Sequence, residues 1–401
     1  MDILEETQQS LKHREWAASK RWNPFNSYKL LAQVYRWRKV RPFKRVPQPA
    51  LVTVDPINVC NNRCVWCNSE FILDTRNRAL SNKALGEIAD FLPKWRGCAT
   101  WEPGVEAVCI AGGGEPLLNK ETGFFIEKCT SNRIEVGVVT NGTLIGSFVE
   151  SLSKCTWVGV SVDAGRAETF KKLKRVASED IFSRIINNIV RLVNYSKRHK
   201  TLLASEGLGY GVSYKYLLHP ENVREIYEAA RLAKSVGCRG FHLRPASNPW
   251  NKLGSELVNF ASEDLEIFVE QMQMARELED ENFSIYGVTH KFDEKLNPAN
   301  YFANCYAVFM SAVFMPRTAE SQDKDAFTFG LCCDRRGDAK LELARNIVSA
   351  CEIEKLWGSK KHWEMFNSIK VEQECPRCTY QPHNQIYEHV ILKDNMTYKF
   401  I

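Results

Sequence analysis

The sequence predicts an α/β fold: a partial (β/α)6 barrel of the TIM-like type, followed by a smaller, cysteine-rich C-terminal domain. Two observations support this prediction. Short strand-like runs alternate with helical segments from Leu51 onward, and this alternation fades after about residue 255. The chain has 401 residues, 44% of them hydrophobic and 25% charged, which suffices for one large and one smaller domain.

The expected strands are short apolar runs rich in β-branched residues, at 51–59, 105–112, 134–142, 157–163, 208–218 and 240–245. Segments with helical periodicity separate them, at 82–92, 121–130, 147–153, 181–195 and 220–236. Such alternation implies parallel βαβ units with right-handed crossovers and a sheet covered on its outer face. A curved partial barrel suits this number of repeats better than a doubly wound sheet, although periodicity alone leaves both open. In either fold, ligands bind at the carboxyl ends of the strands.

Three segments follow from this pattern: a helical, partly basic lead-in over residues 1–50, the barrel over 51–290, and a cysteine-rich domain with a tail over 291–401. The net charge is +6, and basic residues are densest between Arg36 and Arg45. The run is explained by a basic surface that faces solvent. The more specific interpretation is that these residues contact an anionic substrate. Nucleic acid is not the expected partner.

The chain is expected to be cytoplasmic. It has no apolar run of the ~18 residues that a membrane span needs, and its polar first residues do not resemble a signal peptide. Disulfides are rare in that reducing compartment, so the 14 cysteines point to metal or cluster ligation.

The first cysteine group is the triplet Cys60, Cys64 and Cys67, directly after the first expected strand. Three thiolates can hold three irons of a [4Fe–4S] cubane and leave the fourth iron open to a small ligand. A structural zinc site would need a fourth Cys or His nearby, and none occurs in residues 68–87. The triplet therefore indicates a cluster with an open iron.

A CxxxCxxC triplet after a strand, within a six-fold β/α repeat, resembles the radical S-adenosylmethionine (radical SAM) superfamily. The resemblance implies that the open iron chelates S-adenosylmethionine, which is cleaved reductively to a 5′-deoxyadenosyl radical that abstracts hydrogen from a substrate. It also implies an external reductant of the flavodoxin or ferredoxin type. Trp66 holds the position that packs near the adenine in the family.

Later strand ends match the same superfamily. Gly113, Gly114 and Glu115 match a GGEP stretch that offers backbone groups to the methionine amino group. A basic residue after the SxDA stretch approaches the methionine carboxylate in the family, and here it is either Lys174 or Arg175. The other expected contacts are Asn141, Ser161, Ser213 for the ribose, and Arg244 at the mouth of the barrel. Each of these motifs alone is only a turn signal.

The second cysteine group comprises Cys305, Cys332, Cys333, Cys375 and Cys378. The CxxC pair Cys375 and Cys378, with Cys305 and one of the two adjacent cysteines, supplies four thiolates, enough to close one auxiliary [4Fe–4S] cluster. Order and spacing resemble the SPASM or shorter twitch domain of radical SAM enzymes. A structural Zn(Cys)4 site is the competing interpretation. Cys351 is either a core residue or, with the spare adjacent cysteine, a candidate hydrogen donor.

The resemblance implies an enzyme that abstracts hydrogen from a small polar metabolite, such as a sugar, an aminocyclitol or a nucleotide-linked sugar, for oxidation, epimerisation or elimination. The alternative is a maturase acting on a ribosomally made peptide. Relatives of that kind often have a longer N-terminal recognition domain than the 59 residues before Cys60. A non-enzymatic iron–sulfur carrier is the third possibility, but an electron carrier needs no glycine-rich strand ends.

Overall fold

The computed structural model describes residues 36, 39–40, 46–73, 78–96, 104–206, 209–246, 250, 260–287, 302–375 and 378–393. Most of the predicted lead-in, residues 1–50, lies outside these ranges. The predicted domain boundary between 290 and 291 also lies outside them, so both stay predictions.

A single ten-stranded sheet forms the centre of the molecule, in the order β10-β9-β8-β1-β2-β3-β4-β5-β6-β7. Its strands are β1 (Leu51–Val54), β2 (Ala107–Ile110), β3 (Glu135–Thr140), β4 (Trp157–Ser161), β5 (Gly211–Leu218), β6 (Gly240–Pro245), β7 (Ser284–Gly287), β8 (Val313–Pro316), β9 (Phe327–Gly330) and β10 (Glu342–Ile347). All neighbours from β8 through β1 to β7 are parallel, whereas β9 is antiparallel to both β8 and β10. Because β7 and β10 are edges, the barrel is open, which confirms the predicted α/β fold with a partial barrel.

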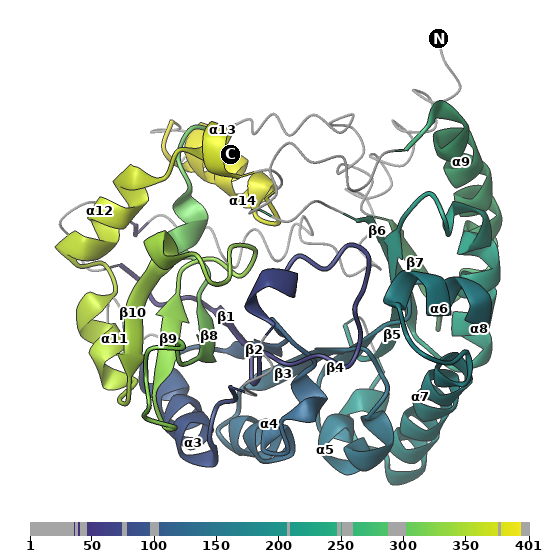
Figure 1. The fold of residues 1–401 in the computed structure, drawn as a ribbon, viewed down its shortest axis with the longest axis horizontal. Coiled ribbons are helices and arrows are strands. Elements are labelled where there is room, and N and C mark those ends of the chain that lie inside the picture. Colours follow the sequence, from purple (N-terminus) through teal and green to yellow (C-terminus); the bar gives the residue numbers. More distant parts are fainter. Residues whose placement is uncertain are drawn as a thin grey trace, which may run out of the picture.

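The helices lie mainly on the outer side of the curved sheet, as Figure 1 shows for α3, α4, α5, α7 and α8. In the barrel they are α3 (Asn82–Phe91), α4 (Thr122–Ser131), α5 (Val149–Ser153), α6 (Ala167–Lys174), α7 (Asp180–His199), α8 (Ile226–Ser235) and α9 (Ser262–Arg276). The C-terminal part adds α11 (Cys351–Leu356), α12 (Lys360–Ser368), α13 (Val371–Glu374) and α14 (Gln381–Ile386). Within the described ranges, none of the helices combines the length and the apolar character that a bilayer crossing requires.

Side chains alternate between the two faces of β5, so that some lie in the core and others face the site. Tyr214 and Tyr216 of β5 are fully buried on the helix-covered side, whereas Leu217 faces the concave side, where it borders a cavity. Lys215 shares this concave face because side chains alternate along a strand. Gly159 of the adjacent strand leaves room for it, since a Cβ there would lie 2.5 Å from Lys215 Cε.

The C-terminal part is attached to the first strand of the barrel. Thr53 of β1 pairs with Val313 of β8. Next to this contact, the Arg336 guanidinium forms a buried ion pair with Asp55, and its Nη2 donates to Asp55 Oδ1 at 3.1 Å. The residues that follow β1 and those that follow β9 are therefore held together.

Candidate active site

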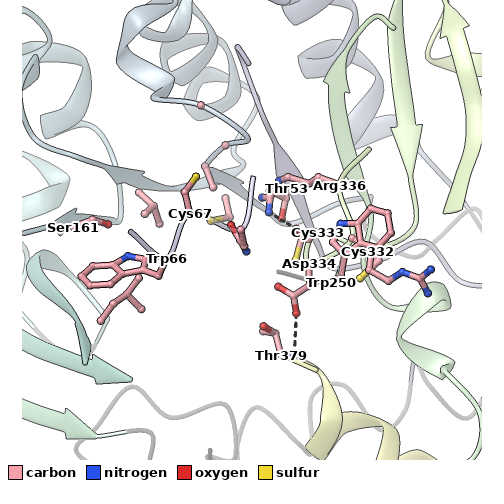
Figure 2. Close-up of a pocket in the computed structure, with 18 of the residues that line it drawn as sticks. Thr53, Trp66, Cys67, Ser161, Trp250, Cys332, Cys333, Asp334, Arg336 and Thr379 are labelled. Carbon is pink, nitrogen blue, oxygen red and sulfur yellow. Dashed lines mark hydrogen bonds between the residues drawn. The ribbon is translucent and has the colours of Figure 1, made fainter. Parts of the chain in front are cut away.

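Both cysteine groups border one cavity of about 400 Å³ at the carboxyl ends of the strands. Figure 2 shows Trp66, Cys67 and Ser161 on one side of this space and Cys332, Cys333 and Asp334 on the other. Segments more than 200 residues apart in the sequence thus meet at one site. Its location matches the edge at which parallel α/β sheets bind ligands.

The loop with the first three cysteines follows β1 and is anchored to the end of α6. The backbone N–H of Arg63 donates to the Lys174 carbonyl at 3.0 Å, and that of Val65 donates to the Leu173 carbonyl at 3.0 Å. These bonds satisfy carbonyls at the C-terminus of α6, which have no partner within the helix. The same helix end therefore orients the cysteine loop.

The end of β3 holds the other side of this loop. Asn141 Nδ2 donates to Asn61 Oδ1 at 2.6 Å, and Asn61 Nδ2 donates to Thr143 Oγ1 at 2.9 Å. Asn141 was predicted as a cofactor contact. It borders the cavity, and its side-chain amide is engaged in positioning the cysteine loop.

The glycine-rich turn after β2 lies directly against the cysteine loop. A Cβ on Gly114 would lie 2.2 Å from the Val59 carbonyl oxygen, so only glycine permits this approach. Glu115 is buried, and its carboxylate accepts from the Asn141 backbone N–H at 2.7 Å and the Leu117 N–H at 3.1 Å. Burial raises the pKa of Glu115, while these donors act against the rise. Gly113 does not border the cavity, in contrast to Gly114 and Glu115.

The chemistry of the first three cysteines suits iron. Burial raises the pKa of all three thiols, that of Cys60 to about 11. At Cys64 the positive charge of Lys174 opposes this rise without reversing it. Such thiols ionise only when a cation offsets the cost, as metal binding does by displacing the protons. Across the described residues, no three Cys, His, Asp or Glu side chains are placed to hold a single metal ion. In a [4Fe–4S] cubane each cysteine binds its own iron, so the three thiols of the first group do not have to meet at one metal ion.

Lys174, rather than Arg175, lies in the cavity. Its side chain is 2% exposed and forms an ion pair with Asp163, which is fully buried. Its Nζ also lies 5.6 Å from the centroid of the Trp66 ring. Arg175 follows the helix with φ 50° and is exposed. The sequence did not single out Asp163, although the SxDA stretch contains it.

The remaining predicted contacts differ in position. Ser161 and Arg244 border the cavity, and Ser213 does not. Below Arg244, the Lys215 Nζ lies 2.6 Å from His242 Nδ1. Burial, and secondarily the charge of Arg244, lowers the pKa of Lys215 to about 8. Of these three residues, only Arg244 borders the cavity.

All five cysteines of the second group border the cavity, but the adjacent pair is directed differently. Burial raises the pKa of Cys378, and the neighbouring thiols that add to this rise are Cys305, Cys332 and Cys375. Cys333 Sγ instead lies 3.6 Å from the Tyr380 hydroxyl, and Arg336 is the main cation acting on it. Cys332 thus acts on Cys378 together with Cys305 and Cys375, whereas the thiol of Cys333 contacts Tyr380.

Comparison with known proteins identifies the class. Residues 54–233 match the radical SAM superfamily. SuiB of Streptococcus suis, solved with bound S-adenosylmethionine, shares the fold with a TM-score of 0.57 and 15% identity, over 95% of this chain and 84% of SuiB. AnSMEcpe, solved with bound AdoMet, has a TM-score of 0.50 and 18% identity, over 82% of this chain and 87% of its own. Residues 54–233 therefore form a radical SAM domain, which makes up somewhat less than half of the chain.

The most similar curated relatives share one activity. A probable GTP 3′,8-cyclase of Methanocaldococcus jannaschii is 30% identical over 142 residues, which is 35% of this chain and 44% of that protein. The GTP 3′,8-cyclase of Campylobacter jejuni subsp. doylei is 26% identical over 143 residues, 35% of this chain and 42% of the relative. The chain thus spans less than half the length of these relatives.

Proposed function

We propose that the substrate binds between two iron–sulfur clusters, one that binds S-adenosylmethionine on Cys60, Cys64 and Cys67, and one auxiliary cluster. The shared cavity supports this proposal most directly, because both cysteine groups border the same 400 Å³ space. That volume lies within the range of small-molecule sites, roughly 300–1,000 Å³. An iron–sulfur carrier would need no such space.

Bound S-adenosylmethionine supplies a 5′-deoxyadenosyl radical once an external flavodoxin or ferredoxin provides an electron. The chain's own residues bind and orient it. Lys174 is the cation for the methionine carboxylate, and Asp163 holds its ammonium in place. The backbone at Gly114 would bind the methionine amino group, and the Trp66 ring would pack against the adenine; both residues border the cavity. Ser161 and Arg244 border the same space. This reductive chemistry also supports a cytoplasmic location.

The auxiliary cluster is assigned to Cys305, Cys332, Cys375 and Cys378, in a C-terminal domain of the SPASM or twitch type. The grouping of Cys332 with the other three cysteines supports this set. Four cysteine ligands leave no open iron. The cluster would then accept an electron from a substrate radical or shape the pocket.

The substrate we propose is a small polar metabolite with an anionic group. Arg244 and Asp334 both border the cavity. Among the described residues neither forms an ion pair, although Asp334 accepts from the Thr379 backbone N–H at 3.0 Å, whereas Lys174 and Arg336 are paired with buried carboxylates. An unpaired cation and an unpaired carboxylate suit a ligand with both anionic and hydrogen-donating groups. Among sugars, aminocyclitols and nucleotide-linked sugars, the relatives that are GTP 3′,8-cyclases favour a nucleotide-bearing substrate.

The reaction is oxidation, epimerisation or elimination, and these relatives add cyclisation as a further outcome of hydrogen abstraction. The second candidate function is peptide modification. It draws on structural neighbours solved with peptides, which share the fold alone. SuiB bound to its precursor peptide SuiA has 16% identity and a TM-score of 0.56, and anSMEcpe with bound AdoMet and Cp18Cys peptide has 18% identity and a TM-score of 0.51.

Hydrogen transfer tests the substrate class. Anaerobic, reconstituted enzyme is incubated with S-adenosylmethionine, dithionite and either GTP, a nucleotide-linked sugar or a short peptide, in deuterated forms. We expect faster 5′-deoxyadenosine formation and deuterium in that product only with a nucleotide-bearing compound. Arg244→Gln should weaken this response, whereas Arg345→Gln, on the surface outside the cavity, should not. Deuterium transfer from the peptide alone would contradict the proposed substrate class.

A further inference from the structure

Asn62 has a buried side-chain amide that the described protein leaves without a partner. The residue is 3% exposed, and neither its Nδ2 nor its Oδ1 has a hydrogen-bond partner. It borders the shared cavity between Cys60 and Cys64. Its backbone N–H lies 3.4 Å from Cys60 Sγ, so the residue is held close to the first cysteine group.

Two nearby amides do have partners, although the Oδ1 of the buried Asn58 has none among the described residues. Asn61 uses both side-chain atoms, toward Asn141 and Thr143. The buried Asn119 donates to the carbonyls of Pro56 and Leu80, each at 2.9 Å. A buried amide without partners is costly, and a leucine of similar size at the same position would avoid that cost. The partner of Asn62 is therefore a ligand that enters the cavity.

We propose that Asn62 Nδ2 donates a hydrogen bond to a sulfur of the cluster held by Cys60, Cys64 and Cys67, and thereby raises the reduction potential of that cluster. The inference rests on the cluster assignment made above. Cluster and thiolate sulfurs are acceptors, and a carboxamide offers two N–H donors. Hydrogen bonds to the sulfurs are among the features that set the potentials of such clusters. The bond strengthens as the cluster gains negative charge, so it favours the reduced state.

Asn62 is a positioning residue in this account, and it acts on electron transfer rather than on the reacting atoms. Its effect would therefore be measurable without turnover. Lys174 also acts on Cys64, but its charge is already paired with Asp163. Asn62 is then the side chain through which the loop itself adjusts the cluster.

The test is a redox titration of Asn62→Leu, followed by electron paramagnetic resonance in the absence of S-adenosylmethionine. We expect a more negative midpoint, seen as a several-fold smaller reduced fraction at the potential that half-reduces the wild-type cluster. A tenfold change in that ratio corresponds to about 59 mV for a one-electron couple. Asn62→Asp, which keeps the size but loses the donors, should shift the midpoint the same way. The control is Asn82→Leu, which removes an exposed amide outside the cavity and should leave the midpoint unchanged.

Three outcomes separate the possibilities. An unchanged midpoint in both Asn62 variants with full cluster content overturns the proposal. So does an unchanged midpoint combined with weaker binding of S-adenosylmethionine, because the amide would then serve that ligand. Absence of the cluster from the wild-type protein would instead refute the cluster assignment on which this inference rests.

Discussion

Lys174 and Asp163 form an ion pair that is buried on both sides, with side-chain exposures of 2% and 0%. Asp163 has φ 62°, and its Oδ1 accepts from the Leu217 backbone N–H at 2.6 Å. The end of β4 is thus bound to β5 and, through Lys174, to the helix end that supports the cysteine loop. The pair connects the barrel wall to the proposed cofactor site.

Removing the cation should destabilise the fold and weaken cofactor binding. Lys174→Met leaves a buried carboxylate without its partner, a change that costs roughly 3–5 kcal/mol in comparable pairs. We expect a loss of that size in the free energy of unfolding by urea denaturation, and weaker binding of S-adenosylmethionine by calorimetry. Arg175→Gln, one residue later and exposed, should change neither. Equal effects of the two substitutions would show that Lys174 has no special role.

The two adjacent cysteines should differ in iron content. Cys332→Ser removes a proposed ligand and should cost the protein its auxiliary cluster, about four irons per chain. Cys333→Ser should retain them, because its thiol lies against Tyr380 rather than among the other cysteines. Iron and sulfide analysis of the reconstituted variants checks this. The reverse pattern would reassign the ligand set.

The contact between Arg336 and Asp55 should hold the C-terminal part on the barrel. Arg336→Met leaves Asp55, which is 2% exposed, without its ion pair, and we expect a loss of roughly 3–5 kcal/mol. Thermal and urea denaturation would measure this. Arg224→Met provides the comparison, since Arg224 and Glu263 are 67% and 72% exposed in their ion pair and such pairs contribute about 1 kcal/mol or less. A similarly small effect at Arg336 would mean that this contact does not stabilise the assembly of the two parts.

Stability should depend on pH through Lys215. Burial lowers its pKa to about 8, from an ordinary value of 10.5. The charged form is therefore disfavoured in the folded state, and this cost is complete below pH 8 and disappears as the pH rises toward 10.5. Lys215→Met should accordingly be more stable than wild type at pH 7, by at most a few kcal/mol. The difference should shrink between pH 8 and 10. A difference that is constant across this range would contradict the assigned titration.

Much of the barrel could be predicted because its strands are apolar runs of clear length, and every predicted strand has a counterpart among β1 to β6. The structure adds β7 (Ser284–Gly287), which the sequence did not indicate. Its four residues contain too few apolar positions to show a period. Strands β8 and β9, with four residues each, are equally short and follow no β/α alternation.

The site was predictable in composition but not in detail. The cysteine groups follow from spacing alone, whereas the choice between Lys174 and Arg175 depends on the residue at which α6 ends. The choice between Cys332 and Cys333 depends on the backbone direction after β9. Asn62 and Asp163 gave no separate signal, because their significance comes from burial and from partners distant in the sequence.

The central claim is that Cys60, Cys64 and Cys67 hold a cluster that cleaves S-adenosylmethionine. Its most direct test is the 5′-deoxyadenosine formed by anaerobic, reconstituted protein with dithionite and S-adenosylmethionine. The wild-type enzyme should form it, Cys64→Ala should form none, and Cys351→Ala, at an exposed position, should match the wild type. Wild-type protein with full iron content that forms no 5′-deoxyadenosine would contradict the claim.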